Sequence, residues 1–211
     1  MKKYISKLHY LTQDLPDRSH VNQVQIACEA GANWIQYRCF SKQREDLLNE
    51  LELISSICDD WGATLIITDH IHLLNDADIQ GVHIEDMQAD FSAIRNTIGE
   101  DKTLGASANT IDDIIRIAES GVVDYIGCGP LRETLTKPNN YSLLGFEGYR
   151  NIANKMKKLG IDIPLLAVGG VVVADIDSLV TAGVYGVAVS AAVNLAENPA
   201  KAFKDFYKKL Y

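Results

Sequence analysis

Eight short apolar runs recur along the 211 residues, and amphipathic segments separate them. The average repeat is about 26 residues, close to the size of one strand followed by one helix. Most runs are continuously apolar rather than alternating, which is typical of strands covered on both faces of a sheet. We therefore expect parallel strands at Leu8–Leu11, Trp34–Arg38, Thr64–Thr68, Gly81–Ile84, Thr103–Ala106, Tyr125–Gly127, Leu165–Val168 and Gly186–Val189.

The segments between these runs carry helical periodicity and helix-end signals. Leu47, Leu51 and Ile54 recur at helical spacing among charged residues. Thr110 offers a hydroxyl cap ahead of two aspartates, and Gly121 can end the helix that follows. Pairs of a small residue and a glycine predict three helix ends, each shortly before a strand, at Ala30-Gly31, Ser120-Gly121 and Ala182-Gly183.

Eight strand–helix units leave two architectures, a closed (β/α)8 barrel or an open doubly wound sheet. Eight strands match the barrel, and no GxGxxG motif follows the first strand, which weakens the dinucleotide-binding alternative. No composition shift or Pro-rich linker divides the chain. We predict an α/β protein with a single-domain (β/α)8 TIM barrel over residues 1–211.

Composition narrows the possible partners and location. Twenty Lys and Arg residues against 28 Asp and Glu residues give a net charge of −8, and no basic run indicates a nucleic-acid partner. No apolar stretch approaches the roughly 20 residues that cross a bilayer. The four cysteines, at positions 28, 39, 58 and 128, show neither CxxC nor zinc-site spacing, which suits a reducing compartment. We expect a cytoplasmic protein whose partners are small molecules.

Functional residues of a barrel lie just after its strands, at their carboxyl ends. Gly169 and Gly170 follow the seventh strand, and Val189 and Ser190 come at the end of the eighth. Glycine lets a backbone approach a ligand closely, and bare N–H groups can bind a dianion. These two loops therefore predict a phosphate site, with a tight turn packed on the barrel rim as the alternative.

Asp69 and Asp86 follow neighbouring strands, so their carboxylates could share one hard cation. Magnesium is commonly held by one or two carboxylates together with substrate phosphates. The pair therefore predicts a Mg²⁺ site. Helix capping is the alternative, because Asp69 precedes a short helix expected at Ile71–Leu74 and Asp86 precedes the next helix. The two roles do not exclude each other.

Lys137 lies in a loop from about residue 129 to residue 145, which is too long for a plain connection. Its ammonium suits a phosphate, and long loops on compact domains often act as lids. A surface lysine in a loop is the alternative.

Histidine and cysteine residues are weaker candidates for the chemistry. His70 and His72 would face different ways in a helix, and His83 is expected to point into the barrel top. Cys39 and Cys128 lie near strand ends, but the sequence shows no histidine partnered with either thiol.

The motifs together resemble the thiamine phosphate synthases and their thiazole tautomerase relatives over nearly the whole chain. The matching pieces are Gln36-Tyr37-Arg38, Ile66-Ile67-Thr68-Asp69, Gly81-Val82-His83-Ile84, Gly105-Ala106-Ser107-Ala108, Asp124-Tyr125-Ile126-Gly127-Cys128-Gly129-Pro130, Thr134-Leu135-Thr136-Lys137, Leu144-Gly145-Phe146-Glu147-Gly148, Val168-Gly169-Gly170 and Gly186-Val187-Ala188-Val189-Ser190. The resemblance implies a (β/α)8 barrel that joins a hydroxymethylpyrimidine diphosphate to a thiazole phosphate and releases diphosphate with magnesium.

The resemblance also implies roles for individual residues. Asp69 and Asp86 would hold magnesium, with Glu85 as the alternative to Asp86. The implied substrate contacts are Arg38, Ser107 and Lys137 as catalytic contacts to the diphosphate, Gln36 near the pyrimidine, Thr68 as a further binding residue, and Thr134, Thr136, Gly170, Val189 and Ser190 around the thiazole phosphate. Small barrels of this kind often form homodimers, so a homodimer is possible.

Two positions depart from the family pattern. Phe40 stands where the family has lysine, and Thr68 stands where it has asparagine. Asn109 replaces the histidine that tautomerase relatives carry, which favours a synthase. Two other functions stay open: a paralogue that binds thiazole or thiamine phosphate without turnover, and another phosphate-handling barrel such as a sugar-phosphate isomerase.

Overall fold

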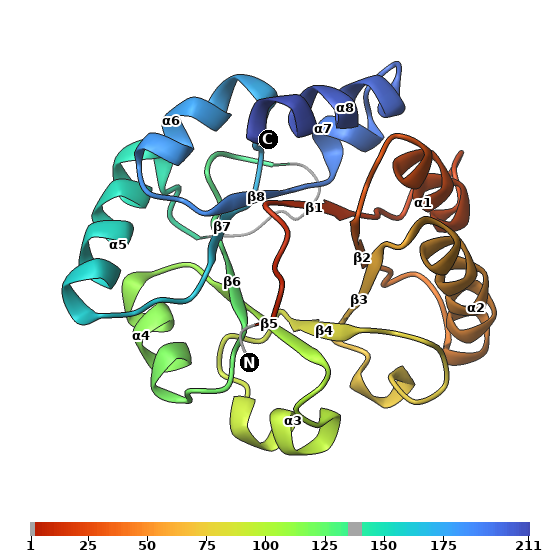
Figure 1. Cartoon of the computed structure of the whole chain (residues 1–211), viewed down its shortest axis with the longest axis horizontal. Coiled ribbons are helices and arrows are strands. Elements are labelled where there is room, and N and C mark those ends of the chain that lie inside the picture. Colours follow the sequence, from red (N-terminus) through yellow and green to blue (C-terminus); the bar gives the residue numbers. More distant parts are fainter. Residues whose placement is uncertain (1–2, 135–140) are drawn as a thin grey trace.

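Eight parallel strands close into one barrel in the computed structural model, which describes residues 3–134 and 141–211. Each strand pairs with its sequence neighbours, and the eighth pairs with the first (Figure 1). The strands are β1 (Leu8–Leu11), β2 (Trp34–Tyr37), β3 (Thr64–Thr68), β4 (Gly81–Ile84), β5 (Thr103–Ala108), β6 (Tyr125–Cys128), β7 (Leu165–Ala167) and β8 (Gly186–Val189). The predicted fold class and all eight strands are confirmed, with bounds that differ by at most two residues.

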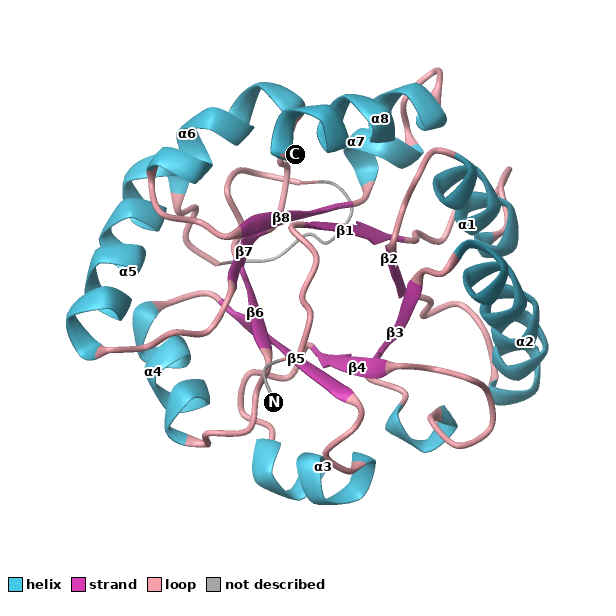
Figure 2. Cartoon of the chain, viewed as in Figure 1, coloured by secondary structure: helices cyan, strands magenta, loops and turns pink. Residues whose placement is uncertain are grey.

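Helices surround the barrel on its outside (Figure 2). They are α1 (His20–Glu29), α2 (Arg44–Trp61), α3 (Phe91–Ile98), α4 (Ile111–Glu119), α5 (Gly145–Leu159), α6 (Ile176–Thr181), α7 (Ala191–Asn194) and α8 (Pro199–Leu210), with 3-10 turns η1 (Ile71–Leu73) and η2 (Val173–Asp175). The connection between β3 and β4 contains only the turn η1. Asn75, Asp76 and Asp78 have short polar side chains of the kind that compete for backbone hydrogen bonds, which disfavours a longer helix there.

Helix-end signals in the sequence correspond to observed caps. The Thr110 hydroxyl accepts a 3.1 Å hydrogen bond from the Asp113 N–H, and the Asp113 carboxylate accepts a 2.9 Å bond from the Thr110 N–H. Gly31, Gly121 and Gly183 have φ angles of 100°, 69° and 96° directly after their helices, where residues with a Cβ would be strained. The predicted starts and ends at these places are confirmed.

Large side chains fill the inside of the barrel below its carboxyl end. Trp34 and Tyr125 form a buried cluster with Ile66 and Leu166. The segment before β1 runs across the barrel opening (Figure 1), where Ile5 joins this cluster. Glycine makes room for the rings: a Cβ on Gly105 would lie 2.2 Å from Cζ of Tyr125. Side chains therefore pack the lower part of the barrel.

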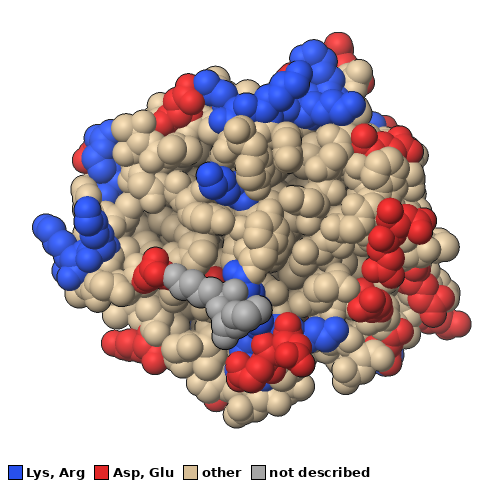
Figure 3. All heavy atoms as spheres, in the orientation of Figure 1, with Lys and Arg blue, Asp and Glu red and all other residues tan. Residues whose placement is uncertain are grey.

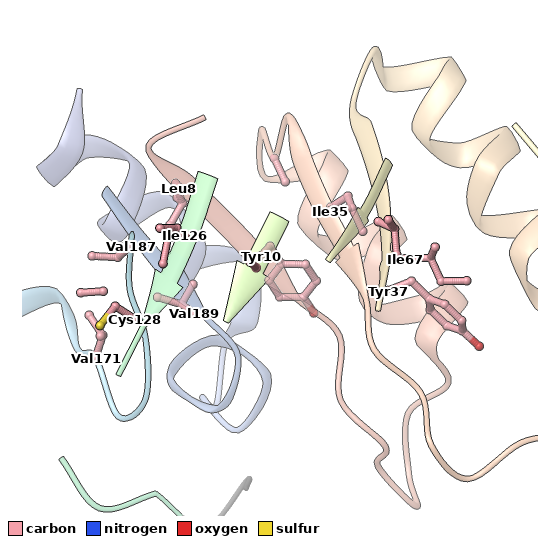
Figure 4. Packing of buried hydrophobic residues seen from close by; sticks show 14 of the residues in the cluster. Leu8, Tyr10, Ile35, Tyr37, Ile67, Ile126, Cys128, Val171, Val187 and Val189 are labelled. Atoms are coloured by element: carbon pink, nitrogen blue, oxygen red, sulfur yellow. The ribbon is translucent and has the colours of Figure 1, made fainter. Parts of the chain in front are cut away.

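The main core lies between the strands and the surrounding helices. Leu8, Tyr10, Ile35 and Tyr37 are buried residues of this layer (Figure 4). Figure 3 shows Lys and Arg gathered over α5 and α8, and Asp and Glu gathered over α2. Within the described ranges, no helix has both the length and the apolar character that spanning a membrane requires.

Candidate active site

A cavity of about 510 Å³ opens at the carboxyl ends of the strands. Seven of the predicted site residues line it: Gln36, Arg38, Ser107, Thr134, Gly170, Val189 and Ser190. They come from β2, β5, β8 and the loops after β2, β6, β7 and β8, so the closure of the barrel brings together residues that lie far apart in the sequence. Thr136 and Lys137 lie outside the described residues.

The loop after β7 has the close approaches that require glycine. Gly169 and Gly170 have φ angles of 87° and 74°. A Cβ on Gly169 would lie 2.6 Å from Cβ of Pro130, and one on Gly170 would lie 2.5 Å from Cγ of Arg132. The bare backbone of this loop therefore forms one wall of the cavity.

Arg132 and Asp175 hold this glycine loop from behind. The guanidinium of Arg132 donates to both carboxylate oxygens of Asp175 at 2.7 Å and to the Gly170 carbonyl at 2.6 Å. Hydrogen bonds to Asp175 raise the pKa of Arg132. Asp175 also accepts a 2.8 Å bond from the Val172 N–H. The sequence reasoning missed this pair, which fixes the loop through bidentate geometry.

Ser190 and Gln13 meet next to this wall, after the neighbouring strands β8 and β1. The Ser190 hydroxyl donates a 3.3 Å hydrogen bond to Oε1 of Gln13, and Asn194 Nδ2 donates to the same hydroxyl at 3.2 Å. Asn194 also accepts a hydrogen bond from the Tyr10 hydroxyl. Gln13 lines the cavity as well, and it was not among the residues expected from the sequence.

Gln36 and Arg38 extend from β2 toward the cavity. Gln36 Nε2 donates a 3.0 Å hydrogen bond to the hydroxyl of Thr68, which is buried and does not line the cavity. Arg38 Nε donates to Glu85 at 2.8 Å, and its guanidinium lies 4.4 Å from the ring centre of Phe40. The structure thus places Thr68 as a support for Gln36, and Glu85 and Phe40 as neighbours of Arg38.

Histidine and tyrosine side chains form the floor of the cavity. His83 lies between the Tyr125 hydroxyl, 3.1 Å from Nδ1, and the Ser107 hydroxyl, 3.0 Å from Nε2. His9 is fully buried, stacks on Trp34 at 4.4 Å, and has no hydrogen-bond partner at either ring nitrogen within the described part of the chain. Burial, together with the nearby His83, holds the pKa of His9 well below its usual range. The neutral form of the His9 imidazole is therefore favoured.

His83 points into the barrel top as expected, whereas His9 was missed. The signal was available, because His9 alternates with the outward-facing Leu8 and Tyr10 along β1. Tyr125 could have been found by the same alternation on β6. Both side chains face inward and line the cavity.

Three carboxylates follow β3 and β4 beside the cavity mouth. Asp69 has a left-handed φ of 61°, and its Oδ1 accepts a 2.8 Å hydrogen bond from the Glu85 N–H. Asp86 is exposed, and its Oδ1 accepts a 2.8 Å bond from the Gln88 N–H. Asp69 and Asp86 do not line the cavity itself, whereas Glu85 does.

Oxygen donors are the type of ligand that a hard divalent cation prefers, although the ligand atoms of Asp69, Glu85 and Asp86 do not all lie within 4.8 Å of one another in the structure. Asp69, Glu85 and Asp86 offer only oxygen ligands, and the first is bonded to the backbone beside the other two.

The fold and the position of the site define the class of protein: a (β/α)8-barrel enzyme that works at the carboxyl ends of its strands. The family model for thiamine monophosphate synthase matches residues 8–193. The chain belongs to this family, which confirms the resemblance and the expected class of transferase.

Curated relatives match over almost their full length. The thiamine-phosphate synthase of Phocaeicola vulgatus is 34% identical over 193 residues, covering 92% of both chains. That of Flavobacterium johnsoniae is 34% identical over 208 residues, covering 98% of this chain and 97% of the relative.

Solved structures share the fold. The thiamine phosphate pyrophosphorylase of Pyrococcus furiosus superposes with a TM-score of 0.82 at 24% identity, covering 97% of this chain and 95% of that chain. That of Bacteroides thetaiotaomicron superposes with a TM-score of 0.67 at 16% identity, covering 97% of each chain.

Proposed function

We propose that this chain is a thiamine-phosphate synthase, which joins a hydroxymethylpyrimidine diphosphate to a thiazole phosphate and releases diphosphate. Family membership over residues 8–193 supports the reaction. The observation that carries the residue assignments is a single cavity lined by seven of the residues that the sequence predicted. A cytoplasmic location and a homodimer stay predictions from the sequence.

Each wall of the cavity suits one part of the two substrates. The floor, with His9, His83 and Gln36, offers a buried ring environment and hydrogen-bonding groups for a flat heterocycle. The wall formed by Gly170 and Ser190 offers backbone and hydroxyl groups for a phosphate. The two substrates would then meet above the floor.

The proposed reaction needs charge neutralisation more than a nucleophile. The bond between the pyrimidine methylene and the diphosphate oxygen breaks, and its electron pair leaves with the diphosphate. The lone pair of the thiazole nitrogen then forms the new C–N bond. Arg38 and Ser107 lie where they can bind the leaving diphosphate, and the closed floor positions the reacting groups and excludes water.

Magnesium fits the carboxylates at the mouth of the cavity. Asp69, together with Asp86 or Glu85, would hold Mg²⁺, whose charge would help neutralise the departing diphosphate.

A turnover assay tests this function directly. Purified protein with both substrates and Mg²⁺ should release diphosphate and form thiamine phosphate at equal rates. Ser107→Ala should lower the rate, whereas Ser56→Ala, in the exposed face of α2 outside the cavity, should not.

A paralogue that binds without turnover is the second candidate, because Phe40 is 53% exposed and supplies no charge at the family's lysine position. Calorimetry with the thiazole phosphate, run beside the turnover assay, separates the two functions. Binding without diphosphate release would support the paralogue and contradict the synthase.

A further inference from the structure

A second cluster of metal-binding side chains lies outside the cavity, where the loops after β1 and β2 meet. Asp14 lies in the first loop, His20 begins α1, and Cys39 follows β2. One ligand atom from each lies within 4.8 Å of the other two, and within residues 3–134 and 141–211 no other such trio of His, Cys, Asp or Glu is found. We propose that Asp14, His20 and Cys39 form a binding site for a divalent transition metal, with Zn²⁺ as the best fit.

The distances between the ligand atoms fit a tetrahedral metal. Nε2 of His20 lies 3.1 Å from Oδ1 of Asp14, and Sγ of Cys39 lies 3.4 Å from the same oxygen. Ordinary zinc bond lengths place neighbouring ligands of a tetrahedron roughly 3.3–3.6 Å apart. A zinc ion therefore needs only a small outward movement of these side chains.

The types of ligand select against magnesium. A thiolate and an imidazole are soft or borderline ligands that favour Zn²⁺, whereas Mg²⁺ prefers oxygen. Three protein ligands leave a fourth position for water, as in open zinc sites. The side chain of Asp14 is 37% exposed while His20 and Cys39 are buried, so an ion can enter from the side of Asp14.

Surrounding contacts hold the three ligands in place. The other carboxylate oxygen of Asp14 accepts a 3.1 Å hydrogen bond from the Phe40 N–H, and Ser41 donates to Oδ1 at 2.6 Å. The Tyr37 ring packs edge-on against His20 at 5.1 Å. Outer contacts of this kind orient metal ligands in known sites. The site is therefore largely formed before an ion binds.

A metal at this position would tie together the two loops beside Arg38. Cys39 directly follows Arg38, and the Arg38 N–H donates a 3.0 Å hydrogen bond to Thr12, shortly before Asp14 in the chain. The site is thus placed to hold two loops together and is separate from the carboxylates after β3 and β4. The proposal does not depend on the function proposed above.

Cobalt spectroscopy on the full chain tests the site without measuring activity. Metal-free protein is titrated with Co²⁺ in excess Mg²⁺, so that the carboxylates after β3 and β4 are already occupied. Wild-type protein should bind one Co²⁺ with a thiolate-to-metal charge-transfer band, and one equivalent of Zn²⁺ should remove that band. Zn²⁺ should also raise the midpoint of thermal unfolding.

Cysteine variants assign the ligand. Cys39→Ala should lose the thiolate-to-metal charge-transfer band. It should also weaken Zn²⁺ binding by more than 100-fold, because loss of a residue that only supports a metal ligand already costs roughly 10- to 100-fold. Cys128→Ala is the matched control, because Cys128 is also buried at a strand end but lies outside the cluster, and it should keep both properties.

Several outcomes would overturn the proposal: a wild-type protein that binds no Co²⁺, a spectrum without the thiolate band, or a Cys39→Ala variant that keeps the band. Should Cys39→Ala fail to fold, His20→Gln decides. The His20→Gln variant should bind Zn²⁺ more weakly than the wild-type protein, whereas Cys128→Ala should bind it as tightly as the wild type. Equal Zn²⁺ affinities of His20→Gln and Cys128→Ala would refute the site.

Discussion

The guanidinium of Arg38 forms a 2.8 Å ion pair with Glu85 across the mouth of the barrel. Arg38 follows β2 and Glu85 follows β4, so the contact passes over the end of β3. The pair is mostly buried, with side-chain exposures of 14% and 18%. The residue proposed to bind the diphosphate is therefore held in position before the substrate arrives.

Replacing Arg38 should slow turnover strongly. A charge-assisted hydrogen bond contributes about 1.5–3 kcal/mol, so Arg38→Ala should lower kcat/KM for the pyrimidine diphosphate about 10- to 100-fold. Arg44→Ala is the control, because Arg44 is exposed, pairs with Asp76 and lies outside the cavity. Steady-state kinetics of the two variants check the prediction, and equal activities would contradict it.

The carboxylates after β3 and β4 should differ in their effect on the magnesium requirement. Asp69→Asn and Asp86→Asn should raise the half-saturating Mg²⁺ concentration, because each removes a charged ligand. Glu85→Gln should instead raise KM for the diphosphate substrate, because Glu85 positions Arg38. Rates measured against Mg²⁺ concentration distinguish these effects, with Asp101→Asn at the opposite end of β5 as control.

A Glu85→Gln variant that changes the magnesium requirement while Asp86→Asn does not would reassign the second ligand. Glu85, rather than Asp86, would then share the ion with Asp69.

A side chain at Gly170 should damage both stability and phosphate binding. At a φ of 74° an alanine costs about 1–2 kcal/mol, and its Cβ would also displace Arg132. Gly170→Ala should therefore unfold at lower denaturant concentration and bind the thiazole phosphate more weakly by calorimetry.

Gly31→Ala is the matched control for this substitution. Gly31 has a φ of 100°, but a Cβ there would meet nothing within 4 Å, and the residue lies far from the cavity lining. It should lose stability yet bind the thiazole phosphate normally. Normal binding by Gly170→Ala as well would contradict the proposed phosphate site.

His9 should make stability depend on pH below neutrality. Its pKa in the folded protein lies well below the ordinary value of about 6.5, so it stays neutral while the unfolded chain takes up a proton. The unfolded state then binds more protons, and the stability that His9 contributes is fully present above pH 6.5 and lost as the pH falls.

Denaturant unfolding at several pH values measures this effect. Between pH 7.5 and pH 5.5 the wild-type protein should lose about 1 kcal/mol more than His9→Phe, which cannot take up this proton. The phenyl ring keeps the stacking against Trp34. Parallel pH curves for the two proteins would show that folding does not lower the pKa of His9.

The barrel itself was encoded locally in the sequence. Continuous apolar runs such as Thr64–Thr68 specify strands covered on both faces, and a hydroxyl cap such as Thr110 specifies a helix start. Once eight such units are counted, the carboxyl ends of the strands must share one rim. That geometry is why the positions of Gln36, Arg38 and Ser107 at the cavity followed from the sequence alone.

Only the tertiary structure decided which of these groups meet. Thr68 lies behind Gln36, and Arg38 pairs with Glu85 over an intervening strand. Cys39 joins Asp14 and His20 although their spacing resembles no known metal motif. These contacts depend on strand register, on side-chain direction and on the closure of the barrel, which bring together residues that are up to 47 positions apart. Local periodicity carries no information about such distances, whereas the packed fold fixes them.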